Sequence, residues 1–222
     1  TGTLTNGPAW TADTAVGGNA LQFDGSNDYV NLGSGSSLNL IGPLSISLWM
    51  NPRNVASGAT QFLLGRGAAR SAAGSVQYNI NLNPYGASSG LNMQVSNGTS
   101  VLEIVTAGNV VSNGSWYHIT GIFDGSQVCI YVNNVNKGCS ASSPNFNSLN
   151  SLAYSPKIGA DSSFSSKYFN GSIDDVRVYN RMLSSSEITE LYNYTGSGSV
   201  APPPTAVSGV CGLTTNSCNA GI

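Results

Sequence analysis

The sequence predicts an all-β fold: a two-sheet antiparallel sandwich, or jelly roll, with one short C-terminal helix. Three observations support this. Apolar and polar residues alternate with period 2 in several segments, which is typical of half-buried strands. These segments recur about every 8–12 residues between Gly, Asn, Ser and Pro clusters. Helical periodicity is almost absent from the rest of the chain.

The alternating segments are the expected strands. They cover 44–50, 76–82, 91–95, 102–105, 116–123 and 128–132. Asn133 and Asn134 separate the last of these from Val135, and Asn tolerates the positive φ that a tight turn requires. A β-hairpin is therefore expected at this point.

One helix is predicted near the end of the chain. Ser184 and Glu187 form a capping-box pattern, and Leu183 and Ile188 have the spacing of a hydrophobic staple. The helix is expected over 185–192, to bury Ile188 and Leu191, and to stop before Gly196.

Composition divides the chain into three parts. Residues 1–195 are long enough for one sizeable core. Residues 196–205 are a Gly/Ser/Pro linker, flexible and then stiff. Residues 206–222 are too short to hold a core and are interpreted as the start of a following module.

The charge content argues against nucleic-acid and membrane functions. Charged residues make up 8% of the 222 residues, the net charge is −2, and the eight Lys and Arg are scattered. No apolar run approaches the ~20 residues of a membrane span. A surface dominated by Ser, Asn, Thr and Gly is typical of an exported protein, so an extracellular or cell-surface location is expected.

The four cysteines indicate disulfides rather than a zinc site. They are Cys129, Cys139, Cys211 and Cys218, without a CxxC pair. Two local disulfides, 129–139 and 211–218, are the simplest of three possible connectivities.

Four stretches resemble the LamG-like jelly roll of the concanavalin A-like lectin/glucanase superfamily. They are 20–30, 44–52, 115–125 with its continuation at 130–133, and 169–181 followed by the capped helix. The resemblance covers about residues 1–195 and implies the jelly-roll fold. It implies less about function, because this fold is shared by lectins, adhesion modules, carbohydrate-binding modules and glycosidases. The strand that usually begins such a domain is not found, which predicts an open sheet edge.

The same resemblance implies a structural calcium ion. The last strand of related glucanases carries an Asp that binds calcium together with backbone carbonyls, and Asp174 matches it. A carbonyl near Gly17 or Gly18 would be the companion ligand, with Asp24 as a further contributor. The alternative is that Asp24 forms an Asx-turn and that Asp174 binds backbone amides.

A sugar site needs an aromatic platform and planar polar groups. The candidates are Tyr78, Tyr85, Arg66, Asp161 and Tyr168. The alternative is that most tyrosines pack on the sandwich. Trp49 and Trp116 are expected in the core, and His118, the single histidine, is expected to be structural.

A catalytic role is not expected. Hydrolysis of a glycosidic bond needs a carboxylate pair roughly 5–9.5 Å apart. Of the three Glu, Glu187 and Glu190 fall on the predicted helix, and Glu103 has no second acid two or four residues away.

Three functions follow, in order of preference. The first is a non-catalytic extracellular module that binds glycans or cell-surface polymers within a larger protein. The second is a structural subunit of a surface filament, pilus or virion fibre that self-associates by strand donation at the open edge. The third is a glycoside hydrolase.

Overall fold

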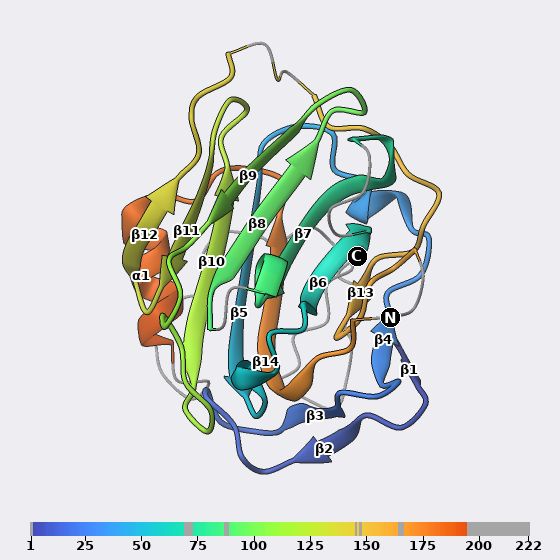
Figure 1. Ribbon diagram of the computed structural model, residues 1–222, viewed down its shortest axis with the longest axis vertical. Coiled ribbons are helices and arrows are strands. Elements are labelled where there is room, and N and C mark those ends of the chain that lie inside the picture. The colour runs from blue at the N-terminus through green and yellow to red at the C-terminus, as the bar shows by residue number, and fades with distance from the viewer. Residues whose placement is uncertain are drawn as a thin grey trace.

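The computed structural model describes residues 2–68, 73–86, 89–144, 146, 148–163 and 167–194. Two antiparallel sheets of seven strands each pack face to face (Figure 1). Sheet A contains, in spatial order, β1 (Thr3–Thr5), β4 (Tyr29–Asn31), β13 (Lys157–Ile158), β6 (Gln61–Gly67), β7 (Val76–Leu82), β8 (Leu91–Ser96) and β9 (Val101–Val105). Sheet B contains β12 (Val135–Cys139), β11 (Val128–Val132), β10 (Tyr117–Phe123), β5 (Leu44–Pro52), β14 (Asn170–Tyr179), β3 (Ala20–Asp24) and β2 (Ala9–Thr11). The predicted all-β sandwich is confirmed.

The core lies between the sheets because each strand directs alternate residues inward. In sheet B, Leu48 of β5 pairs with Ile119 of β10, and both are buried. In sheet A, Ile80 of β7 pairs with Met93 of β8, and both belong to the same core cluster as Leu48 and Ile119. Gly121 lets the two layers approach, because a Cβ atom there would lie 2.5 Å from the Met93 Sδ atom.

The alternating patterns located the strands well. β7 and β11 have the predicted bounds, whereas β5 continues to Pro52 and β10 begins at Tyr117. The hairpin at Asn133 and Asn134 is confirmed, with φ angles of 49° and 63°.

A three-residue strand forms one edge of each described sheet. β1 borders sheet A and β2 borders sheet B, and each has three residues. Leu4 on β1 and Trp10 on β2 are 42% and 43% exposed.

The helix α1 (Ser185–Asn193) packs on sheet B. The Ser184 side chain accepts a hydrogen bond from the Glu187 amide, and the Glu187 side chain accepts one from the Ser184 amide. Ile188 and Leu191 are buried with Leu183 and Ile122. The capping box and the predicted buried face are thus confirmed, and the helix ends one residue later than predicted.

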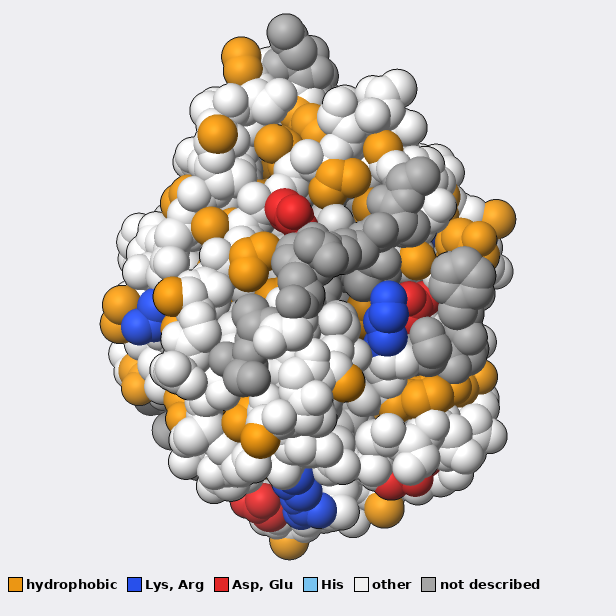
Figure 2. Space-filling view, in the orientation of Figure 1, with side chains coloured by type: hydrophobic (Ala, Val, Ile, Leu, Met, Phe, Trp, Pro, Cys, Tyr) orange, Lys and Arg blue, Asp and Glu red, His pale blue; other side chains and the backbone are white. Residues whose placement is uncertain are grey.

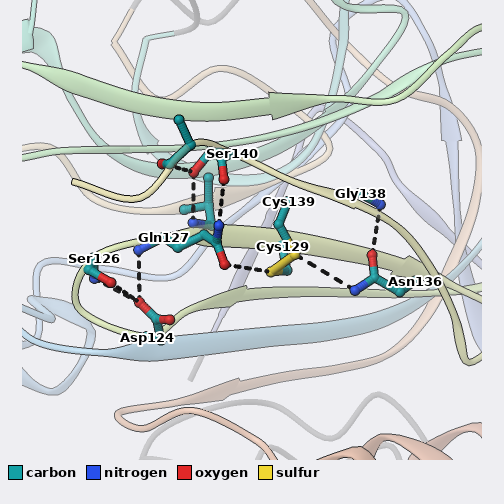
Figure 3. Close-up of a disulfide and its surroundings, with 10 residues drawn as sticks. Asp124, Ser126, Gln127, Cys129, Asn136, Gly138, Cys139 and Ser140 are labelled. Carbon is teal, nitrogen blue, oxygen red and sulfur yellow. Dashed lines mark hydrogen bonds between the residues drawn. A yellow bond between two sulfur atoms is a disulfide. The ribbon is translucent and has the colours of Figure 1, made fainter. Parts of the chain in front are cut away.

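The β11–β12 hairpin carries a disulfide. Cys129 and Cys139 are direct cross-strand partners and are bonded to each other (Figure 3). The neighbouring turn is closed by the Asp124 carboxylate, which accepts hydrogen bonds from the Ser126 and Gln127 amides (Figure 3). The 129–139 pairing is confirmed. Cys211, Cys218 and the linker and tail predicted from residue 196 lie outside the described residues.

None of the helices in the described part of the chain has the length and apolar character needed to cross a membrane.

Candidate functional site

Tyr78 and Arg66 lie inside the sandwich. Tyr78 is fully buried, and its hydroxyl donates a 2.8 Å hydrogen bond to the Leu38 carbonyl. Arg66 donates from Nε and Nη2 to the Leu152 carbonyl. Burial raises the pKa of Tyr78 and lowers the pKa of Arg66. Neither side chain offers a surface to a sugar, so the structure assigns both a structural role in place of the expected ligand contact.

The other predicted sugar contacts are dispersed. Asp161 is buried, and its Oδ1 atom accepts 2.7 Å hydrogen bonds from the Ser163 amide and hydroxyl. Tyr168 is half-buried and immediately precedes Phe169 and β14. The side chain of Tyr85 lies outside what the structure describes. The structure therefore does not assemble these residues into one site.

The predicted calcium ligands lie in two places. Asp24 is exposed and closes a turn by accepting hydrogen bonds from the Ser26 and Asn27 amides, and the Ser26 amide lowers its pKa. The β3–β14 register places Asp24 opposite Asn170, four residues along the strand from Asp174. Asp24 thus forms the alternative Asx-turn and does not join Asp174.

Asp174 meets the loop that carries Gly17 and Gly18. Its buried carboxylate accepts hydrogen bonds from the Thr14 hydroxyl, the Ala15 and Val16 amides and the Asp175 amide. The Thr14 hydroxyl oxygen also lies 3.2 Å from the Gly17 carbonyl oxygen. The predicted proximity of Asp174 and this loop is present. However, the groups facing the carboxylate are hydrogen-bond donors, whereas calcium needs six to eight oxygens. These surroundings suit a carboxylate that holds the loop by accepting hydrogen bonds from its amides better than they suit a calcium ion. We call this set of hydrogen bonds from the loop to Asp174 the amide clamp.

Trp49, Trp116 and His118 lie on the outer face of sheet B, not in the core as predicted for both tryptophans. Trp49 stacks on Tyr192 of α1 with ring centroids 5.8 Å apart. Trp116 donates a 3.0 Å hydrogen bond to the Asp13 carboxylate. Trp49 and His118 pair with each other in the phase of β5 and β10 opposite to the inward residues Leu48 and Met50, and Trp116 immediately precedes β10.

His118 is structural, as the sequence predicted. Its Nε2 atom lies 2.8 Å from the Ser47 hydroxyl, and its ring contacts Trp49. Burial, reinforced by the charge of Arg177, lowers the pKa of His118 to about 3. The imidazole is therefore neutral near pH 7.

The outer face of sheet A carries an amide network that sequence reasoning missed. Asn79 donates to Gln94, and Asn81 donates to both Asn79 and Asn92. These side chains occupy the polar positions of the alternating patterns in β7 and β8, so the network could have been predicted from those patterns. They are buried and largely satisfy one another, which makes the network a structural element of the sheet. Figure 2 shows that charged side chains are few and scattered on the face it displays.

A pocket of about 290 Å³ opens at one end of the sandwich. Strand β5 ends there, and β8 and β10 begin there. Its lining is formed by Val55, Ser89, Asn109, Val110, Val111, Ser112 and Tyr117. The Tyr117 ring packs against the core, and its oxygen lies 3.0 Å from the Ser112 hydroxyl and 3.1 Å from the Ser112 amide. We call these seven residues the rim pocket.

The walls of the rim pocket are fixed by hydrogen bonds. The Val55 amide donates to the Asn113 side chain (2.9 Å), and the Gly114 amide donates to the Pro52 carbonyl (2.9 Å). On the other side, the Val110 amide donates to the Ser89 carbonyl (3.1 Å). The pocket thus combines apolar side chains, two serine hydroxyls, one side-chain amide and one tyrosine in an open, pre-formed depression. Sequence reasoning missed it because its residues come from four separated segments.

The three glutamates lie on two elements of the described structure, β9 and α1. Glu103 is exposed on β9, whereas Glu187 caps α1 and pairs with Arg181, with 2.6 Å between Oε1 and Nη2. Glu190 is on the same helix. None of these glutamates lines the rim pocket.

Solved structures share this fold at low sequence identity. The binding domain of Paraclostridial Mosquitocidal Protein 1 matches with a TM-score of 0.68 and 16% identity, over 89% of this chain and 48% of that one. Domain 4 of AbnA, a GH43 extracellular arabinanase from Geobacillus stearothermophilus solved with arabinotriose, matches with a TM-score of 0.63 and 22% identity, over 86% and 88%. Domains LG4-5 of the mouse laminin alpha1 chain match with a TM-score of 0.52 and 15% identity, over 74% and 44%.

The chain spans about half the length of the mosquitocidal binding domain it matches. No curated protein sequence shows a significant match. A family model described as the concanavalin A-like lectin/glucanases superfamily matches residues 24–189, which is most of the chain. The sequence resemblance is thereby confirmed, and the chain belongs to the concanavalin A-like lectin/glucanases superfamily.

Proposed function

We propose that this protein is a non-catalytic binding module for glycans, acting outside the cell as part of a larger protein. The observation that carries the proposal is the rim pocket, in which Tyr117 and Ser112 present hydroxyls beside the apolar side chains of Val55 and Val111. Sugars offer an apolar ring face and a rim of hydroxyls, and this combination matches both.

The similar structures support the proposal at the level of a binding module. They include toxin binding domains, and the arabinanase domain was solved with arabinotriose. The extracellular setting is supported by the Cys129–Cys139 disulfide, since disulfides persist in oxidising compartments. A non-catalytic role is supported by the lining of the rim pocket, because none of its seven residues carries a carboxylate and glycoside hydrolysis uses a carboxylate pair about 5–9.5 Å apart.

The test is binding of the full chain to an immobilised glycan array, with a parallel assay for sugar release. We expect retention on a subset of glycans and no released sugar. Absence of retention across the array would reject the glycan-binding function, and released sugar would reject the non-catalytic assignment. Multivalent display is advisable, because single sugar sites are weak and avidity raises the signal.

Self-association is a second proposal. Leu4 and Trp10 are large apolar side chains exposed on short edge strands, which is where a strand from another copy would add. Light scattering of the full chain separates the two functions: filaments or ladders favour a structural subunit, whereas a monomer favours the binding module.

A further inference from the structure

We propose that the rim pocket selects an uncharged sugar and holds no more than two rings. This inference rests on the proposed glycan-binding function and deepens it. It is derived from the charge, the hydrogen-bonding capacity and the size of the pocket.

The pocket lining carries no Asp, Glu, Lys, Arg or His. Its seven residues are three valines, two serines, one asparagine and one tyrosine. A ligand carboxylate or sulfate placed there would lose part of its hydration without gaining a cationic partner, which favours an uncharged sugar over it. The lining therefore discriminates against uronic acids, sialic acids and sulfated sugars.

The hydroxyl pair supplies one free donor whichever way it is oriented. Ser112 Oγ and Tyr117 Oη are 3.0 Å apart, and either can donate to the other. If Ser112 donates, the Tyr117 proton is free, and if Tyr117 donates, the Ser112 proton is free. The Ser112 amide already donates to Tyr117 Oη at 3.1 Å, which holds the phenol in place. One hydroxyl proton thus remains to donate to a sugar hydroxyl oxygen.

The volume restricts the length of the ligand. The rim pocket measures about 290 Å³, at the lower end of the roughly 300–1,000 Å³ of pockets that hold drug-sized ligands. A pocket of this size holds one sugar ring, or two at most. Additional rings would lie outside it and contribute little to affinity.

The test is titration calorimetry of the full chain with four probes: arabinobiose, arabinotriose, digalacturonic acid and trigalacturonic acid. We expect binding of both arabinose oligomers, with affinities within about twofold of each other, and no heat from the acidic pair. Tyr117→Phe keeps the ring and removes the hydroxyl, and it should weaken binding about tenfold, which corresponds to roughly 1.4 kcal/mol. Ser112→Ala should have a similar effect, because it also breaks the pair.

A second depression provides the control. It measures about 400 Å³, includes Ile41, Pro43 and Asn180 in its lining, and contains no aromatic residue. Asn180→Ala should leave the affinity unchanged. Binding that survives both Tyr117→Phe and Ser112→Ala would overturn the assignment to the rim pocket.

The remaining outcomes separate the inference from the proposed function. Binding of the galacturonic acids, or a gain of about tenfold or more from arabinobiose to arabinotriose, would overturn the inference and leave glycan binding intact. Failure of both arabinose oligomers would also overturn it, and the glycan array would then decide whether the proposed function survives.

Discussion

The Ser47 hydroxyl lies 2.8 Å from Nε2 of His118, diagonally across the β5–β10 ladder of sheet B, in which His118 pairs with Trp49. The contact is sealed by the rings of Trp49 and Tyr192, so His118 has no aqueous environment in which to take a proton. A depressed pKa makes folding stability depend on pH through this one side chain.

Stability should therefore fall as the pH drops below about 6.5. The unfolded chain protonates His118 near pH 6.5, whereas the folded chain does so only near its pKa of about 3. Above pH 6.5 both states are neutral and the full stability is present. Between these values the unfolded state binds one more proton, so the free energy of unfolding decreases by about 1.4 kcal/mol per pH unit.

Urea denaturation at pH 5.0, 6.0 and 7.0 measures this effect. His118 is the single histidine of the chain, so His118→Gln should remove that slope while carboxyl titrations stay common to both proteins. Equal slopes in the two proteins would show that His118 is accessible to protons in the folded state.

The Cys129–Cys139 disulfide should stabilise the fold measurably. It closes a loop with a sequence separation of 10, and the chain-entropy relation gives about 2.7 kcal/mol for a loop of that size. Cys129→Ser with Cys139→Ser should therefore lower the free energy of unfolding by about this amount. The matched control is Cys211→Ser with Cys218→Ser, which leaves the Cys129–Cys139 bond in place. It should cost the domain much less, because both residues belong to the segment 206–222, which the sequence predicts to be too short to hold a core. A larger loss of unfolding free energy from the Cys211 and Cys218 substitutions would show that these two cysteines stabilise the protein more than the Cys129–Cys139 disulfide does.

Gly121 should not tolerate a side chain. An added Cβ would lie 2.5 Å from Met93 Sδ and 2.8 Å from Ile80 Cδ1, between the two sheets. Gly121→Ala is expected to cost about 1–3 kcal/mol through overpacking. Gly42→Ala is the control, because nothing lies within 4 Å of its added Cβ. Thermal unfolding of both variants checks the prediction, and similar melting temperatures would show that the sheets can separate at little cost.

Local sequence patterns account for most of the fold. Alternation located β7 and β11, and the Ser184–Glu187 pair located the start of α1, because these signals act over a few residues. The same alternation contained the correct positions of Tyr78 and Trp49. Tyr78 is in phase with Val76 and Ile80 and faces inward, whereas Trp49 is out of phase with Leu48 and faces outward.

The rim pocket could not be derived in this way. Val55 follows β5, Ser89 precedes β8, and Tyr117 begins β10, so their proximity depends on how the two sheets stack. For Asp24 and Asp174 the sequence predicted a proximity that the structure does not show. Both lie on paired strands near the expected calcium position, but the β3–β14 register places Asp24 four residues away from Asp174 along the sheet.

The role of Asp174 can be separated from calcium by experiment. Its carboxylate holds the loop at Thr14, Ala15 and Val16 through hydrogen bonds. Each buried amide that is left without this acceptor costs the folded state roughly 1–3 kcal/mol of stability. Asp174→Ala should therefore lower the free energy of unfolding by about 3 kcal/mol even in excess EGTA.

Calcium at Asp174 remains a prediction from the family resemblance. Thermal unfolding of the chain and its variants in calcium and in EGTA tests it. If the ion binds, excess calcium should raise the melting temperature of the unmodified chain, since a ligand at a hundredfold excess over its Kd adds about 2.7 kcal/mol. Asp174→Asn should abolish that shift, whereas Asp24→Asn should preserve it, because Asp24 closes a separate turn. A stability loss in Asp174→Ala that appears only with calcium present would show that the ion, and not the amide clamp, holds the loop. A loss of equal size in EGTA and in calcium would assign the loop to the carboxylate itself.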